Sequence, residues 1–358
     1  MTHSIHIVRR YGLVGGMENY VVNLTNALAS AGQRVTVICE VNECFGIDNV
    51  QFESAIEWVE LGNTYRKPRW LAQWGFSQRV SEYIAKGLHK GAIIHSHERT
   101  ADHHVTTFHG PPFLMRKRRL LDFLSPRIHM WTYLEKQELL GEQVLAILPN
   151  SPLIGGQLKS LYPSIADKVL APAYPGVAAN LSSIKRRSDG FTVGFLGKEW
   201  KRKGLDVASQ IVVALRQRLP QIHFVVAGCD PLAIQHLFND WPDGSYTLAG
   251  WLDDPESFLG KIDLLLHPAR AEPFGMAIAE ANAAGIPVIV SEHCGVAALI
   301  GEAQGSVCEL DVQKPNIMPW VDACMARLSQ PRAVTSFNLS WGALAEQHIL
   351  LYQSLRLV

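Results

Sequence analysis

Residues 264–289 read LLLHPARAEPFGMAIAEANAAGIPVI, and this stretch decides the fold. Its apolar start predicts a strand that ends at His267, because strands covered on both faces are nearly continuous in Leu, Ile and Val. Pro273 is placed to be the first residue of a helix, where a proline loses no hydrogen bond, and Gly285 is placed to end that helix. A second apolar run follows at 287–291. The stretch therefore predicts a strand, a helix and a strand of a parallel α/β sheet.

The same alternation of apolar runs and helix-length amphipathic segments fills both halves of the chain. It predicts an α/β protein with two Rossmann-like, doubly wound parallel sheets that are wrapped by helices. The expected strands lie at 5–9, 35–40, 57–61, 92–95, 105–108 and 144–149 in the first half, and at 191–197, 222–228, 246–250, 262–267, 287–291 and 306–310 in the second. The final segment, 341–355, predicts a helix that packs on either half.

A segment with two prolines and a glycine, 172–180, is followed by the polar stretch 182–190. Neither has hydrophobic periodicity, so together they predict a linker. We place the boundary near residue 178, which gives one domain at 1–177 and another at 178–358. Ligands of open parallel sheets bind at the carboxyl ends of the strands. The functional residues are therefore expected directly after strands.

The composition excludes several classes of protein. The chain has 358 residues, with 33 Lys plus Arg and 33 Asp plus Glu, and so no formal net charge. Nucleic-acid binding usually needs a basic excess, so no nucleic-acid partner is expected. No run of about 18 uncharged apolar residues predicts a membrane span, and the N-terminal residues do not read as a secretion signal. The 6 cysteines form no C-x-x-C pair, which indicates free thiols in a cytoplasmic protein.

A glycine-rich turn follows the first expected strand. Gly15 and Gly16 allow the chain to turn sharply, and the backbone amides of the next helix could then approach a phosphate. A dinucleotide site would also need an acid after the second strand, and Glu40 stands there. A tight turn without any ligand explains the two glycines equally well. From these residues alone the three interpretations stay open.

Glu272 and Glu280 frame the expected helix of the quoted stretch. Eight positions along a helix separate them by about 12 Å, which is too far for the paired acids of a typical hydrolase. This is about the span from the sugar of a nucleotide sugar to its ribose. The diphosphate between would face the free amides of Phe274, Gly275 and Met276. Alternatively, Glu272 favours the positive end of the helix and Glu280 is a solvated helix residue.

The segment from Glu272 to Glu280, with the following A-x-A-A-G-x-P-V-I, resembles the E-x7-E signature of retaining glycosyltransferases of the two-Rossmann GT-B architecture, family GT4. The residues Gly15-Gly16-Met17-Glu18 are similar to the amino-terminal glycine loop of that family. The resemblance implies that Glu272 approaches the hydroxyls of the donor sugar and that Glu280 binds the ribose. It also implies retention at the anomeric carbon, with no bound metal and no cofactor besides the nucleotide sugar.

A basic cluster follows the expected strand at 191–197. Lys198 and Lys203 occupy the two basic positions that the family carries there, where cations would stabilise a departing diphosphate. The family often has Arg at the first position, and Lys lacks the forked geometry of Arg. Arg202 therefore competes with Lys198 for one of the two roles. Exposed basic residues are also common beside a helix start, and this alternative stays open.

The first half is rich in histidine after two of its expected strands. His109 stands in a segment, TTFHG, that resembles the strand end from which the family's histidine approaches the donor sugar. His97, Glu98 and Arg99 end a neighbouring strand and, with Glu18, are candidates for the acceptor side. Metal binding by these histidines is not expected, because no H-x-x-x-H pair lies on an evident helix.

The basic run Arg116, Lys117, Arg118 and Arg119 is flanked by apolar residues. This combination is typical of a surface that rests on anionic lipid, and also of a plain solvated face. The two interpretations remain equal.

These observations predict a glycosyltransferase that moves a hexose from a nucleotide diphosphate sugar, UDP-sugar first, to a glycan or glycolipid acceptor such as a lipopolysaccharide core. The first domain would face the acceptor and the second would bind the nucleotide sugar. The alternatives are an epimerase or phosphorylase of the same fold, an NAD-dependent enzyme that uses residues 12–16 and Glu40, and a non-catalytic nucleotide-sugar binding protein.

Overall fold

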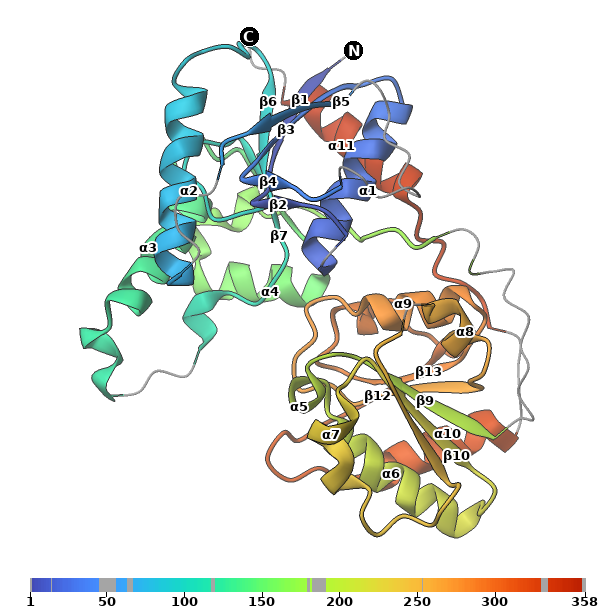
Figure 1. Cartoon of the computed structure of the whole chain (residues 1–358). Helices are drawn as coiled ribbons and strands as arrows, with labels where there is room; N and C mark the ends of the chain where they lie inside the picture. The colour runs from blue at the N-terminus through green and yellow to red at the C-terminus, as the bar shows by residue number, and fades with distance from the viewer. Residues whose placement is uncertain are drawn as a thin grey trace. The chain divides into compact units, whose positions relative to one another are not determined.

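The computed structural model of the protein (Figure 1) describes residues 2–13, 15–44, 56–62, 67–116, 120–178, 181, 191–252, 254–329 and 334–355. The chain divides into two compact units. Unit 1 consists of Met1–Gly176 and Ser340–Val358, and unit 2 is Val177–Leu339. The C-terminal helix therefore belongs to unit 1. The whole polar stretch 182–190 lies outside the described residues.

Unit 1 contains a parallel sheet of 6 strands in the order β5-β3-β1-β6-β7-β8. The strands are β1 (His3–Ile7), β3 (Arg34–Cys39), β5 (Ile56–Glu60), β6 (Ile93–Ser96), β7 (Val105–Phe108) and β8 (Ala146–Pro149). This order is that of a doubly wound sheet, whose direction of winding reverses between β1 and β6. A small second sheet pairs β2 (Arg10–Tyr11) with β4 (Val41–Asn42), which the sequence did not predict because the strands have only 2 residues each.

Helices cover both faces of this sheet. They are α1 (Gly16–Ser30), α2 (Arg69–Ile84), α3 (Pro126–Leu140), α4 (Pro152–Leu161) and α11 (Trp341–Ser354), with short 3-10 turns η1 (Phe113–Met115), η2 (Leu120–Leu124) and η3 (Pro163–Lys168). Figure 1 shows α1 and α11 side by side, and their apolar residues share one core with alternate residues of β3. Ile5 and Ile7 of β1 point to the opposite face, where Phe76 and Val80 of α2 pack.

Unit 2 repeats the same topology with strand order β11-β10-β9-β12-β13-β14, again all parallel. The strands are β9 (Thr192–Leu196), β10 (His223–Ala227), β11 (Tyr246–Gly250), β12 (Leu264–His267), β13 (Val288–Ser291) and β14 (Gly305–Cys308). The helices are α5 (Trp200–Lys203), α6 (Leu205–Arg218), α7 (Pro231–Ile234), α8 (Pro255–Leu259), α9 (Met276–Ala283) and α10 (Met318–Ser329), with 3-10 turns η5 (Gln235–Leu237) and η6 (Gly295–Leu299). The winding reverses between β9 and β12.

Each predicted strand overlaps an observed one, with ends that differ by up to two residues, so the prediction of two parallel α/β sheets is confirmed. The predicted start of the helix in the quoted stretch is wrong, because α9 begins at Met276 and not at Pro273. Glu272 pairs in an isolated bridge with Cys294, which keeps the chain extended, and Gly275 then turns it with a φ of 113°. The predicted end is confirmed, since Gly285 follows the helix with a φ of 74°.

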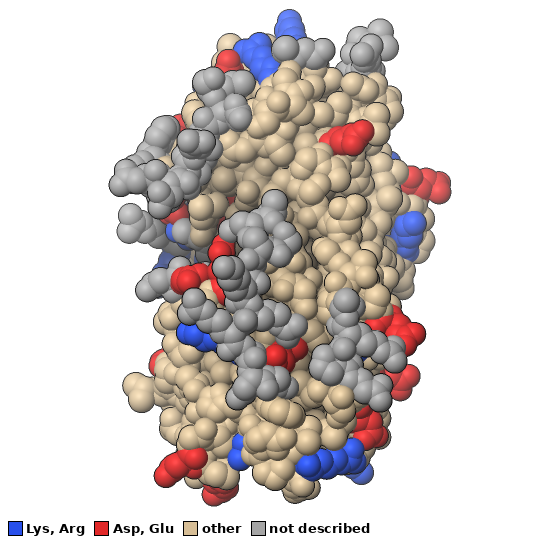
Figure 2. Space-filling view, turned by 90° about the vertical axis from the view of Figure 1, so that its right-hand side faces the viewer, with Lys and Arg blue, Asp and Glu red and all other residues tan. Residues whose placement is uncertain are grey.

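Surface charge, helix hydropathy and the state of the cysteines can each be compared with the expectations from the composition. Figure 2 shows Lys and Arg interspersed with Asp and Glu, without a continuous basic area on the described part of this face. Among the helices of the described ranges, none has the length and apolar character needed to cross a membrane. The 6 cysteines are buried and free, as their spacing predicts.

Candidate functional site

The candidate site of unit 2 lies where the winding of its sheet reverses, at the ends of β9 and β12. The backbone around Glu272 is held on the loop after β13: its amide donates to the His293 carbonyl (3.0 Å), and its carbonyl accepts from the Gly295 amide (2.8 Å). Gly275 has a backbone conformation that side chains rarely adopt, and a Cβ there would lie 2.8 Å from Ile278 Cδ1. Glycine is therefore required at the turn into α9.

Two glycines bring Lys203 to the same place. A Cβ at Gly197 would lie 2.2 Å from Lys203 Cδ, so the lysine side chain passes directly over the end of β9. Gly204 has a φ of 77°, and a Cβ there would lie 1.9 Å from the carbonyl oxygen of Pro268 in the loop after β12. The close approach of these two loops puts the Lys203 ammonium beside Glu272.

Three basic side chains surround one carboxylate oxygen of Glu272. Oε2 lies 2.9 Å from Lys203 Nζ, 3.4 Å from Arg202 Nη1 and 3.6 Å from His267 Nε2. Burial by itself raises the pKa of Glu272, but the His267 imidazole and the charges of Lys203 and Arg202 outweigh it and hold that pKa far below its usual range. Glu272 is therefore an ionised acceptor of hydrogen bonds at neutral pH.

The other predicted cations divide between two places. Arg202 lies beside Lys203, and its guanidinium also donates to Glu199 (2.7 Å) and to the carbonyl of Ala271. Lys198 is exposed, and its ammonium lies 5.2 Å from the centre of the Trp251 ring. The structure thus brings Arg202 and Lys203 together at Glu272 and places Lys198 apart from them.

Glu280 projects from the middle of α9. Burial raises the pKa of Glu280, and the charge of Lys203 opposes that rise, so Lys203 acts electrostatically on both acids of the signature. The first hydrogen bonds of α9 run from the Ile278 and Ala279 amides to the Gly275 carbonyl, which puts Met276 at the open, positive end of the helix. Phe274 and Gly275 precede the helix and are buried, which corrects the expectation that all three residues form its first turn.

Unit 1 contains a cavity of about 250 Å³ at the ends of β6 and β7. Four of the predicted residues line it, namely His97, Glu98, Arg99 and His109. Met17 of the glycine loop also lines the cavity. The structure therefore unites most of the candidate residues of the first half in one pocket.

The sequence analysis missed Glu138 and Glu135, two acids on α3. Glu138 lines the cavity, accepts from Thr106 Oγ1 (2.9 Å) and lies 3.9 Å from Arg99 Nε. Glu135 accepts from Arg99 Nη2 (3.2 Å). The i, i+3 spacing of the two acids on one helix face was the available signal. Burial raises the pKa of both Glu98 and Glu138 to about 7, so both can carry a proton near neutral pH.

His109 is fixed on several sides. Its carbonyl accepts from Asn150 Nδ2 (2.9 Å), its ring lies 4.7 Å from the Tyr20 ring in an edge contact, and its Nε2 is 3.1 Å from His97 Nδ1. Burial lowers the pKa of His109 to about 3. The imidazole is therefore neutral at pH 7 and can donate or accept at the cavity.

The glycine loop leads into α1 as predicted. Gly15 is the extended residue before the helix, and a Cβ there would lie 2.5 Å from Glu18 Oε2, so the Glu18 side chain folds back over the loop. Gly16 is exposed, with no atom within 4 Å of the position of a Cβ. The dinucleotide interpretation fits poorly, because Glu40 is buried with one oxygen 2.6 Å from Arg9 and the other 2.5 Å from Arg79.

One group of described residues has the chemistry of a metal site. His6, His95 and His97 place ring nitrogens within 4.8 Å of one another. His95 lies face-on to His97, however, with ring centres 4.5 Å apart and an angle of 21° between the planes. The lone pairs of an imidazole lie in its ring plane, so those of His95 run beside the other two rings and not toward a shared point. This geometry favours packing and hydrogen bonding over metal coordination.

Of the basic run in unit 1, the structure describes Arg116 and leaves residues 117–119 outside the described ranges. Arg116 lies 3.7 Å from Asp122. Next to it, Phe123 and Leu124 are 65% and 67% exposed, which is unusual for large apolar side chains.

Two models of known families match the chain. The model described as Glycosyltransferase Family 4 matches residues 14–178, and the model described as Glycosyl transferases group 1 matches residues 190–326. The matches fall on the two units in turn, and together they take in most of the chain.

Two curated relatives are similar over part of the chain. The O-antigen biosynthesis glycosyltransferase WclY of Escherichia coli is 33% identical over 108 residues, which are 29% of this chain and 29% of WclY. The lipopolysaccharide glucosyltransferase WaaG of Escherichia coli K12 is 31% identical over 112 residues, which are 30% of each protein. Each alignment thus spans less than a third of the relative's length.

Solved structures are similar over nearly the whole chain. The crystal structure of WaaG matches with a TM-score of 0.73 and 16% identity, over 96% of this chain and 94% of that one. The structure of Anabaena Alr3699/HepE in complex with UDP and glucose matches with a TM-score of 0.60 and 15% identity, over 98% of each chain. At such identities the likeness concerns the fold, and it confirms the predicted pair of Rossmann-like domains.

Proposed function

Because this chain belongs to glycosyltransferase family 4 and has the GT-B fold, we propose that it transfers a hexose from a nucleotide diphosphate sugar to a hydroxyl of a glycan or glycolipid, with retention at the anomeric carbon. The observation that carries this proposal is the contact of Lys203 and Arg202 with Glu272 at the entrance to α9. It puts two cations and the positive end of a helix within reach of one ligand. That combination suits a diphosphate that gains charge as the glycosidic bond breaks.

We assign the roles in the donor site as follows. Lys203 and Arg202 neutralise the departing diphosphate, and the amide of Met276 contributes from the helix end. Glu272 accepts hydrogen bonds from the sugar hydroxyls, for which its low pKa suits it, and Glu280 binds the ribose. No metal takes part in this assignment. Lys198, on the exposed side near Trp251, would join only after movement of its side chain.

The proposed acceptor side is the cavity of unit 1. His109 would contact the transferred sugar, and Arg99 with Glu98 and Glu138 offers both a cation and protonatable acids to acceptor hydroxyls. We favour a UDP-sugar because HepE, which shares the fold, was solved with UDP and glucose. We favour a lipopolysaccharide or related surface glycan because WclY and WaaG, by name, act on such glycans.

We further propose that Arg116, Phe123 and Leu124 touch the inner face of an anionic membrane when the acceptor is a glycolipid. Their exposure and mixed basic and apolar character support this contact. Binding to vesicles with phosphatidylglycerol, but not to vesicles of phosphatidylcholine alone, would support it. Equal binding to both, or none, would contradict it.

The proposed activity is tested in two steps. A thermal-shift screen over UDP, GDP, ADP and their sugars should show selective stabilisation by one base, since stabilisation grows with ligand concentration over the dissociation constant. Product analysis should then show transfer only when an acceptor glycan is present, with the anomeric configuration retained by NMR. Turnover of the UDP-sugar alone would indicate an epimerase, turnover only with phosphate a phosphorylase, binding without turnover a carrier, and binding of NADH a dinucleotide enzyme.

A further inference from the structure

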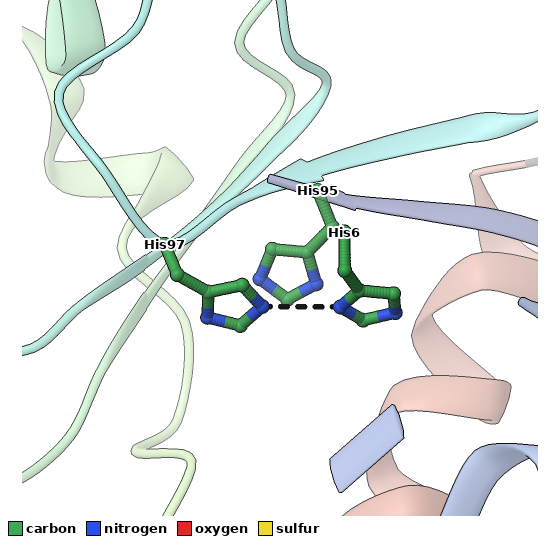
Figure 3. A group of neighbouring side chains, drawn as sticks. All are labelled: His6, His95 and His97. Carbon is green, nitrogen blue, oxygen red and sulfur yellow. Dashed lines mark hydrogen bonds between the residues drawn. The ribbon is translucent and has the colours of Figure 1, made fainter. Parts of the chain in front are cut away.

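A chain of hydrogen bonds runs from Ser4, a buried residue of β1, to His109 at the cavity of unit 1. Ser4 Oγ lies 3.2 Å from His6 Nε2, His6 Nδ1 lies 3.0 Å from His97 Nε2, and His97 Nδ1 lies 3.1 Å from His109 Nε2. Figure 3 shows the middle contact, between His6 on β1 and His97 after β6. The chain thus spans the place where the winding of the sheet reverses, and it ends at the ring that lines the cavity.

Each of the three rings carries one proton. Burial lowers the pKa of His6 and of His109 to about 3 and that of His97 well below its usual value, so all three are neutral at pH 7. A neutral imidazole has one nitrogen that donates and one that accepts. A hydrogen bond between two rings needs one donor and one acceptor. The protonation of one ring therefore fixes that of the next.

Only two arrangements satisfy every contact. In the first, all three rings are protonated at Nδ1: Ser4 donates to His6, His6 to His97 and His97 to His109, and His109 presents an N–H at its remaining nitrogen. In the second, all three are protonated at Nε2: His109 donates to His97, His97 to His6 and His6 to Ser4, and His109 presents a lone pair. Both arrangements contain the same number of protons.

We propose that His6 and His97 are positioning residues, which couple the tautomer of His109 to their own through these hydrogen bonds and thereby govern whether His109 offers a donor or an acceptor to a ligand in the cavity. The effect of the His109 tautomer on catalysis rests on the proposed function, because that function requires a sugar to bind beside His109. Two neighbouring imidazoles, His95 and His348, do not take part in this hydrogen-bond chain. His95 bonds to Tyr352 (2.5 Å) and Thr107 (2.8 Å), and His348 bonds to the carbonyl of Leu344 (2.8 Å).

A fixed tautomer matters because a ring with its proton on the wrong nitrogen turns a donor toward a donor of the substrate, or an acceptor toward an acceptor, and the hydrogen bond is lost. In serine proteases, loss of the residue that holds the catalytic histidine in the correct tautomer lowers kcat by about 10⁴. Which nitrogen of a histidine carries the proton is generally set by the partner of the other nitrogen. His97 provides that partner for His109, and His6 provides it for His97.

The test is long-range ¹H–¹⁵N NMR of the full chain with labelled histidine, at pH 7. In the wild type we expect His6, His97 and His109 to show one and the same tautomer. In His6→Phe the aromatic packing remains but the first link is lost, and we expect mixed tautomers at His97 and His109. Transfer by this variant should show kcat reduced by at least about tenfold with KM for the donor nearly unchanged.

Two further variants make the result specific. His6→Asn keeps a hydrogen-bond partner for His97 Nε2, because its amide offers both a donor and an acceptor, and it should return His97 and His109 to one shared tautomer. His348→Phe removes a buried imidazole of the same cluster outside the chain, and it should leave the His109 tautomer and kcat as in the wild type.

If His6, His97 and His109 of the wild-type protein had different tautomers, the proposal would be overturned, even if His6→Phe fails to fold. An unchanged His109 tautomer in a folded His6→Phe protein would overturn it as well. A protein that shows the expected tautomers but transfers no sugar would instead contradict the proposed function, so the two failures are distinguishable.

Discussion

The ammonium of Lys203 lies 2.9 Å from a carboxylate oxygen of Glu272, and the two side chains are 15% and 10% exposed. Lys203 ends the short helix α5 after β9, and Glu272 lies in the loop after β12; these two strands are neighbours because the sheet reverses its winding there. Gly197 and Gly204 leave the space that allows the approach. The contact between Lys203 and Glu272 therefore depends both on the strand order of unit 2 and on the opposite charges of the two side chains.

We expect Lys203→Met to reduce sugar transfer by about 10²-fold or more, because a fixed cation at the departing group is lost. Loss of the ammonium also removes one cause of the low pKa of Glu272, so that pKa should rise. Steady-state kinetics and carboxyl NMR measure the two effects. Lys201→Met is the matched control, since Lys201 is exposed on the same short helix with its ammonium near the Trp200 ring. Equal activity of both variants would remove Lys203 from the mechanism.

We expect Glu280→Gln to weaken donor binding by about 1.5 to 3 kcal/mol, the scale of hydrogen bonds to a charged group. Isothermal titration calorimetry with the nucleotide sugar measures the change. Glu309→Gln, an exposed acid of the same unit, should leave the affinity unchanged. An unaltered affinity in Glu280→Gln would show that this acid does not touch the donor.

Gly204→Ala and Gly285→Ala separate two causes of strain. Both glycines have a positive φ, 77° and 74°, which costs a side chain about 1–2 kcal/mol. A Cβ at Gly204 would also collide with the Pro268 carbonyl, whereas no atom lies within 4 Å of one at Gly285. Urea unfolding should therefore show Gly204→Ala to be less stable than Gly285→Ala by about 1–3 kcal/mol. Equal losses would mean that the loops after β9 and β12 lie farther apart than described.

Acid should destabilise the protein through its buried histidines. Burial lowers the pKa of His348 to about 4, while the unfolded chain takes up the proton near pH 6.5. Between these values the unfolded state binds more protons, so the free energy of unfolding falls as the pH falls. Glu98 and Glu138 have the opposite effect, because their pKa of about 7 makes the folded state bind more protons from about pH 4.3 to 7.

The variant His348→Phe isolates the histidine contribution from that of the acids. Its loss of stability between pH 7 and pH 5 should be smaller than that of the wild type by about 2 kcal/mol. Urea unfolding at both pH values measures this difference. His236→Phe, at an exposed position of unit 2, should keep the wild-type dependence. A His348→Phe protein that loses as much stability as the wild type would show that folding does not lower the pKa of His348.

The strands could be predicted because their signal is local: a buried parallel strand is a short apolar run between turn residues. Glu272 could be found because its motif is contiguous. The start of α9 could not, because the bridge from Glu272 to Cys294 that delays it forms between distant segments. The same holds for Glu138, which is one polar helix residue among several in sequence and becomes part of a cavity only beside Arg99.

The arrangement of histidines was also beyond prediction from the sequence. His6 is opposite His95 only because β1 pairs with β6 and not with a strand closer in the chain. The contacts among His6, His95 and His97 follow from the order of the strands in the sheet, and no local sequence pattern encodes that order. The choice between Lys198 and Arg202 was open for a similar reason, since the side-chain positions depend on Trp251 and Ala271.

The return of α11 to unit 1 affects how the protein can be made. Leu344, Ala345 and Tyr352 of this helix belong to the same core as α1. A ribosome that has already produced residues 16–30 must synthesise all of unit 2 before it supplies this cover. Until then the part of the α1 surface that packs on α11 stays open to other chains or to chaperones, so biosynthesis leaves the first unit unfinished until the second is complete.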